Sequence, residues 1–304
     1  MGSAVLGLLG AFVYGSADFL GGVAARRIGP LRTTAVGAAA GLVLLVLMVP
    51  VVGGTWSAAA LGWGALSGLA GAVAIALLYG CLAIGPMSIL SPLTALVSGL
   101  VPVTWGLVGG DRFQPIGYLA LGLALVAVVL VGFVPEKNAV RPQTRALLMA
   151  VGAGAMIGVF LILLDHTPDD SGVVPLIANR VTNAAVMWTV VAIVVVRARS
   201  RVAVAVAAAS GPVAGMPAPL RGGMRLESRG VAIAVGGGAL DATANLLILI
   251  GLRLGDLTTV SVLTALYPAG TVLLAAVVLR ERVAPVQWGG LVLAIVAAAL
   301  LAVS

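Results

Sequence analysis

Apolar runs of about twenty residues alternate with short polar breaks along the whole chain. A helix needs ~20 apolar residues to cross a hydrocarbon core of about 30 Å, so each run is long enough to span a membrane. The runs lack the period-2 alternation of barrel strands, which favours helices. The pattern predicts ten spanning helices, at residues 3–24, 33–53, 58–82, 87–108, 114–134, 144–164, 174–196, 230–252, 257–279 and 285–303.

The composition supports this prediction. Hydrophobic residues make up 61% of the 304 residues, and charged residues only 9%, against about 25% in a soluble globular domain. So few charges cannot cover a water-facing surface, which excludes an ordinary soluble enzyme, a disordered chain and, despite the net charge of +7, a nucleic-acid-binding domain. We therefore expect an all-α, multi-pass protein that lies in the lipid bilayer of the cell (inner or plasma) membrane.

Several kinds of site are missing from the sequence. Cys81 is the single cysteine and His166 the single histidine, which excludes a disulfide framework and a metal site built from several histidines. HExxH, P-loop and GxSxG motifs are absent. No basic segment precedes the first apolar run, so we expect no cleavable signal peptide. We expect no enzyme, no cofactor and no metal, and we expect any active transport to use a gradient rather than ATP.

Basic residues gather in alternate loops. Fourteen of the 17 Lys and Arg residues lie in the odd-numbered loops, including the Gly- and Pro-rich segment 197–229, whereas the loop after the sixth span is acidic. The positive-inside rule then places the odd-numbered loops in the cytoplasm and both termini outside.

The two halves of the chain repeat each other at an offset of 170 residues. Residues 68–115 align without gaps on 238–285, and the densest match pairs Ser91-x-Leu-Thr-Ala-Leu with Ser261-x-Leu-Thr-Ala-Leu. We expect repeats at 1–135 and 136–304. Five spans per half is an odd number, so the second copy enters the membrane from the opposite face. Such a repeat predicts a site near the midplane and alternating access by rocking of the halves.

Several motifs resemble those of the drug/metabolite transporter superfamily, in its ten-helix form with two EamA repeats. Leu266-Tyr-Pro, Leu279-Arg-Glu-Arg and Gln287-Trp-Gly-Gly are similar to the family's C-terminal pattern, and Gly110-Asp-Arg-Phe-Gln-Pro is a weaker copy in the first half. The Tyr14-Gly-Ser-Ala-Asp-Phe segment is similar to the opening of the family's first helix. The resemblance implies a transporter, commonly an exporter. It also implies both termini in the cytoplasm, against the charge count.

Ionisable groups inside a membrane are costly, so each is a candidate for function. Asp241 lies at the centre of its span, and Asn245 follows one turn later on the same face;. Asp241 can bind a cationic group or a proton, or pair structurally with an amide or hydroxyl. Asp18 can do the same or pair with Arg26 and Arg27. Arg180 can bind a substrate carboxylate or pair with acids of the 165–170 loop, and its neighbours Asn179 and Asn183 are candidates with it.

Uncharged residues complete the candidate site. Thr94 and Thr264 occupy equivalent repeat positions, and Tyr267-Pro268 follows one turn after Thr264. Tyr79 can add an aromatic wall. Prolines within spans free backbone groups, which is tolerated where neighbours or cavity water satisfy them; the relevant prolines are Pro92, Pro102 and Pro268.

We interpret other patterns as structural. Asp111-Arg112 and Glu281-Arg282 lie at span ends as acid–arginine pairs. Glycines four residues apart permit close helix packing, within one chain or between two; they include Gly37/Gly41, Gly64/Gly68, Gly106/Gly110 and Gly154/Gly158.

The sequence thus predicts a secondary transporter of a small metabolite, amino-acid-like or drug-like solute, exporting it by alternating access, with protons as the coupling ion because the buried candidates are carboxylates. The alternatives are a membrane accessory subunit that transports nothing and, less favoured, an intramembrane lipid-modifying enzyme. The oligomeric state, monomer or homodimer, stays open.

Overall fold

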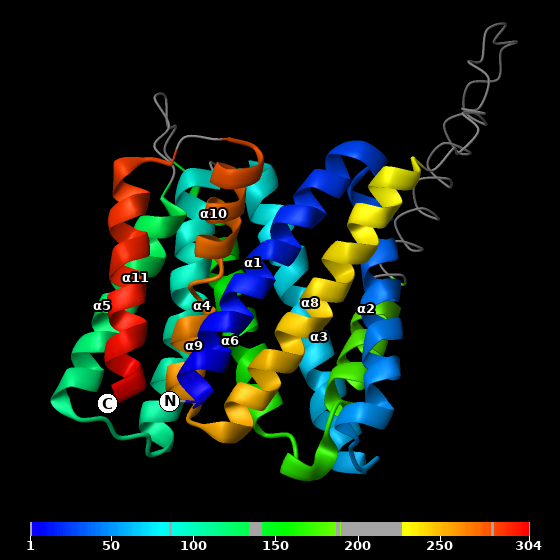
Figure 1. Cartoon of the computed structure of the whole chain (residues 1–304), viewed down its shortest axis with the longest axis horizontal. Coiled ribbons are helices and arrows are strands. Elements are labelled where there is room, and N and C mark those ends of the chain that lie inside the picture. Colours follow the sequence, from blue (N-terminus) through cyan, green and yellow to red (C-terminus); the bar gives the residue numbers. More distant parts are fainter. Residues whose placement is uncertain are drawn as a thin grey trace, which may run out of the picture.

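A computed structural model of the protein describes residues 2–84, 87–133, 142–186, 189, 227–280 and 283–303. It is a bundle of long helices (Figure 1), and these ranges contain no strand. The elements are α1 (Gly2–Ile28), α2 (Pro30–Val52), α3 (Ala58–Ile84), α4 (Met87–Gly109), α5 (Pro115–Gly132), α6 (Thr144–Asp165), the short 3₁₀ helix η1 (Asp169–Ser171), α8 (Ser228–Leu254), α9 (Leu257–Thr264), α10 (Pro268–Val278) and α11 (Pro285–Val303). Residues 174–186 form a further helix, called here the 174–186 helix.

The described residues include nine helical segments that are long and apolar enough to cross a membrane. The protein is therefore an all-α, multi-pass integral membrane protein, as predicted. The seventh predicted span begins at residue 174, as expected, and is helical through 186. The rest of that span and most of the basic 197–229 segment lie outside the described residues.

The ninth predicted span differs from the prediction because it is broken in the middle. α9 ends at Thr264 and α10 begins at Pro268. Between them, Leu266 N–H donates to the carbonyl oxygen of Leu263 at 3.1 Å, and Tyr267 N–H donates to that of Thr264 at 3.0 Å. Proline has no N–H to continue the α-helical ladder. Pro92 and Pro102, by contrast, lie within the continuous helix α4.

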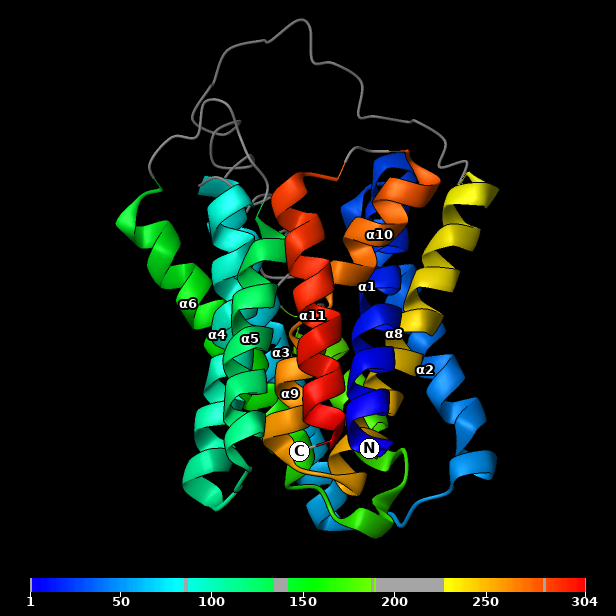
Figure 2. The same cartoon turned by 60° about the vertical axis from the view of Figure 1, so that its left-hand side comes forward.

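Both chain ends lie at one end of the bundle, called here the termini end (Figures 1 and 2), together with the loops 53–57, 110–114 and 166–173. Two of these loops are joined there: Thr55 N–H donates to the Asp170 carbonyl oxygen at 2.9 Å, and Val173 N–H donates to that of Gly53 at 3.2 Å. The 28–30 turn lies at the opposite end.

Small residues let the helices pack closely. α1 packs along α8, α3 along α6, and α5 along α11. A side chain at Gly238 would collide with the backbone of Gly37, and one at Gly68 would collide with the backbone of Asn179. Three of the predicted glycine pairs therefore pack inside the bundle; they are Gly37/Gly41, Gly64/Gly68 and Gly154/Gly158. Cys81 is fully buried among apolar neighbours.

Candidate functional site

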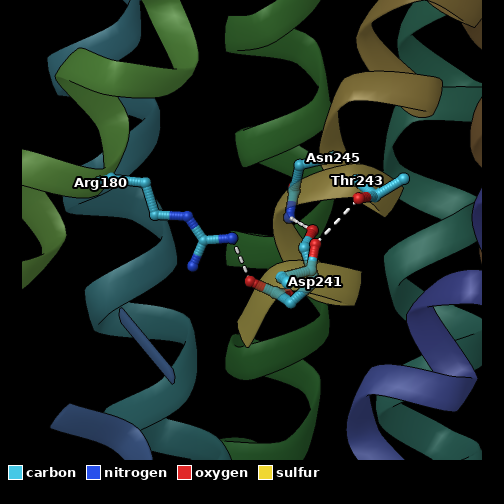
Figure 3. Close-up of polar contacts among 5 residues, drawn as sticks. Arg180, Asp241, Thr243 and Asn245 are labelled. Atoms are coloured by element: carbon cyan, nitrogen blue, oxygen red, sulfur yellow. Dashed lines mark hydrogen bonds and ion pairs between the residues drawn. The ribbon is translucent and has the colours of Figure 1, made fainter. Parts of the chain in front are cut away.

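An ion pair lies in the middle of the bundle. Asp241 is thirteen residues from each end of α8, and its carboxylate pairs with the guanidinium of Arg180 from the 174–186 helix (Figure 3). The side chains are 19% and 26% exposed for Arg180 and Asp241, respectively. Gly41 on α2 lies beside the arginine: a Cβ there would be 3.6 Å from Arg180 Cζ, an ordinary van der Waals contact.

The sequence left two alternatives open for each residue: a cation or proton, or an amide or hydroxyl partner, for Asp241, and a substrate carboxylate or the acids of the 165–170 loop for Arg180. The structure shows a partner that was not among them. The two side chains neutralise each other, because an unpaired charge this deep in the bundle is far costlier than a paired one. Asn245 Nδ2 donates to the backbone carbonyl oxygen of Asp241 at 2.8 Å, not to its carboxylate, and Thr243 also bonds its own helix backbone (Figure 3).

Asp18 lies beside this ion pair without being part of it. Its charge acts on the phenols of Tyr14 and Tyr267, and the charge of Asp241 acts on Asp18. Asp18 is exposed, although its neighbours on α1, Ala17 and Phe19, are buried. The alternative pairing with arginine is not formed: Arg27 pairs with Glu227 at 2.7 Å, and within the described part of the chain Asp18 has no ion pair or hydrogen bond.

Two tyrosines stand next to Asp18. The rings of Tyr14 and Tyr267 meet edge to face, with centroids 5.7 Å apart and planes at 61°. Tyr267 was predicted as a site residue, whereas Tyr14 was missed. The signal was available, because Tyr14 precedes Asp18 by four residues and therefore shares its helix face. The helix break at 265–267 places Tyr267 against α1, where a side chain at Gly15 would collide with the Tyr267 carbonyl oxygen.

The remaining predicted residues are spread over several helix contacts. Thr94 is fully buried and donates to the Leu90 and Ala150 carbonyl oxygens at 2.9 and 3.2 Å, so it ties α4 to α6. Asn179 Nδ2 donates to Ser67 Oγ at 2.8 Å and ties the 174–186 helix to α3. Asn183 Nδ2 also faces α3: a Cβ on Gly71 would lie 3.2 Å from it.

Two predicted residues remain, Thr264 and Tyr79. Thr264 is 8% exposed, and its buried hydroxyl has no hydrogen-bond partner among the described residues. Tyr79 belongs to α3, and its side chain lies outside the described part of the structure.

The acid–arginine pair at the end of α4 is not formed. Asp111 Oδ2 accepts hydrogen bonds from the backbone N–H of Thr258, at 3.3 Å, and from the Thr258 hydroxyl. Arg112 donates instead to backbone carbonyl oxygens at 3.3 Å. A carboxylate is favoured at the N-terminus of α9 by the unpaired N–H groups there. The equivalent pair at 281–282 lies outside the described residues.

Comparisons with known proteins agree with this architecture. A sequence model described as the EamA-like transporter family matches residues 144–303. A search of the curated proteins finds no match. A solved structure described only as "Crystal structure of protein" superposes with a TM-score of 0.70 and 16% sequence identity, covering 99% of this chain and 98% of the other. At that identity the likeness concerns the fold alone.

Proposed function

Because the chain belongs to the EamA-like transporter family, we propose that it is a secondary transporter that exports a small metabolite, amino-acid-like or drug-like solute across the cell (inner or plasma) membrane. The observation that carries this proposal is the central cluster of Asp18, Arg180 and Asp241. Charged groups in the middle of membrane helices are costly, and they mark solute or ion pathways.

Reciprocal contacts support two inverted halves, 1–135 and 136–304. A side chain at Gly15 in α1 would collide with residues 267 and 271 of the broken ninth span. One at Gly158 in α6 would contact Val101 of α4, and residue 101 is the repeat partner of residue 271 at the 170-residue offset. The first helix of each half thus packs on the fourth helix of the other, as a two-fold axis in the membrane plane requires.

The contacts at the two ends of the bundle support alternating access, with the termini end closed and the opposite end open. At the termini end, Arg253 Nη2 donates to Ser171 Oγ and to the Gly172 carbonyl oxygen, both at 2.9 Å. Toward the opposite end, Asp18 is exposed, and a Cβ on Gly22 would have no neighbour within 4 Å. We place the opposite end in the cytoplasm, because the basic loops belong to it. An exported solute would then enter there.

Proton exchange is the coupling that we propose, with Asp18 as the carrier. Asp241 is held by Arg180, whereas Asp18 has no cationic partner among the described residues. The groups within electrostatic range of Asp18 include Tyr14 on its own helix, Tyr267 at the helix break and Asp241. When Asp18 is protonated it is neutral. The protein can then change between its two access states without a bound solute.

Counterflow in proteoliposomes tests the proposal. The full chain is reconstituted and screened for exchange of radiolabelled amines, carboxylates and amino acids, at one acidic and one alkaline pH. We expect saturable exchange that depends on pH. Asp18→Asn should abolish the pH dependence, whereas Glu227→Gln, which removes an exposed carboxylate near the end of α1, should leave it unchanged. A chain that exchanges no solute and co-purifies with a stable partner would instead be an accessory subunit.

A further inference from the structure

The charges in the central cluster do not cancel. Arg180 and Asp241 neutralise each other in one ion pair, and Asp18 is a second carboxylate within electrostatic range of Asp241. The cluster therefore carries one excess negative charge when both acids are ionised. Such an excess attracts a cation and repels an anion.

Two tyrosine rings lie near this excess charge. Tyr14 is one helical turn before Asp18, and Tyr267 meets Tyr14 edge to face at 5.7 Å. Tyr14 therefore links the carboxylate, one turn away on the same helix face, with the second ring;. A carboxylate beside aromatic rings is the combination that recognises ammonium ions, through ion pairing and through attraction of the cation to the ring faces.

The carboxylate is also accessible. Asp18 lies ten residues before the end of α1 at Ile28, about 15 Å from the helix end at 1.5 Å per residue. It is exposed, and an added Cβ on Gly22, one turn further toward that end, meets nothing within 4 Å. The same helix face then reaches the exposed Arg26. Asp18, Gly22 and Arg26 thus lie along one exposed face of α1, between the middle and the opposite end of the bundle.

We propose that the solute bound at this site is an organic ammonium ion with an apolar body, held by Asp18 and by the rings of Tyr14 and Tyr267. The proposal rests on the proposed transport function and names its substrate class. An anionic solute would need Arg180, which Asp241 already occupies. A zwitterion would have to break that ion pair to place its carboxylate.

Three probes that share one phenyl body and differ in charge test this proposal: 2-phenylethylammonium, 3-phenylpropionate and phenylalanine. Binding to the purified full chain is measured by calorimetry, and exchange of the same probes is measured in proteoliposomes. We expect the ammonium ion to bind and exchange, and to exceed both other probes in affinity by on the order of tenfold or more.

Variants separate recognition from folding. Asp18→Asn should weaken binding of the ammonium probe at least about thirtyfold, and Asp18→Glu, which keeps the charge, should restore most of it. Tyr14→Phe keeps an aromatic face and should retain binding, whereas Tyr14→Leu should lose on the order of tenfold. Glu227→Gln removes the same charge from an exposed site and should leave binding of the ammonium probe unchanged. The melting temperature without ligand shows that each variant is folded.

The outcomes distinguish the two proposals. If 3-phenylpropionate or phenylalanine exchanges and the ammonium ion does not, transport stands and the cation assignment is overturned. If Asp18→Asn binds the ammonium probe as tightly as the wild type does while remaining folded, the cation assignment is also overturned. If the ammonium ion binds through Asp18 and no solute exchanges, the cation site is supported and the proposed transport function is contradicted.

Discussion

Two arginines reach between helices in this protein, and they do so in opposite ways. Arg180, in the middle of the bundle, meets a carboxylate and remains 19% exposed. Arg253, at the termini end, donates to the neutral oxygens of Ser171 and Gly172, and its buried Nε has no partner among the described residues. The first contact is a charge pair that a charged solute can disturb, whereas the second ties a loop to α8. Membrane depth alone therefore does not decide the role of an arginine; its partner does.

The largest effect is expected from breaking the central pair on one side only. Arg180→Leu leaves Asp241 as an unpaired charge inside the bundle and should lower the free energy of unfolding by about 3 kcal/mol, the lower end for a buried pair because this one is partly exposed. Asp241→Leu should cost a similar amount. The double variant Arg180→Leu with Asp241→Leu should recover most of the stability, because no lone charge remains.

Chemical unfolding in detergent micelles, analysed as a double-mutant cycle, measures the coupling between the two residues. Asn179→Leu provides a control on the same helix, since Asn179 bonds Ser67 and not Asp241. A double variant as unstable as the sum of the single variants would show that the two charges do not stabilise each other, and the contrast with Arg253 would disappear.

Hydropathy predicts the spans well, because each helix must satisfy its backbone within the hydrocarbon and needs a long apolar run to do so. It cannot predict which charges meet. Arg180 and Asp241 are 61 residues apart in the chain and lie on two different helices, the 174–186 helix and α8. Each residue taken alone therefore had several plausible partners.

The broken ninth span shows a similar limit. Pro92, Pro102 and Pro268 all remove a backbone donor, and only the last accompanies a break. The difference involves packing: Gly15 on α1 approaches the backbone of residues 267–271, and Thr271 Oγ1 donates to the Gly15 carbonyl oxygen at 3.1 Å. The ring contact between Tyr14 and Tyr267 accompanies this packing, and hydropathy alone cannot predict it.

A smaller effect is expected at the termini end. Arg253→Met removes hydrogen bonds from a charged donor to Ser171 and Gly172, so it should cost about 2 kcal/mol of unfolding free energy. The loop 166–173 should also become more accessible, which limited proteolysis or hydrogen exchange can measure. Arg112→Met at the same end is the matched control; it removes an exposed arginine with backbone bonds at 3.3 Å and should change stability by less than about 0.5 kcal/mol.

The smallest effect is expected from the second ion pair, Arg27 with Glu227 at the opposite end. Its N···O distance is 2.7 Å, but the two side chains are 42% and 47% exposed. Water and salt screen such a pair, so Glu227→Gln should cost between about 0 and 1 kcal/mol, and the loss should shrink as ionic strength rises. Unfolding at low and high salt measures both. A loss as large as that of Arg180→Leu would mean that the geometry of a charge pair, and not its depth and solvent access, sets its contribution in this bundle.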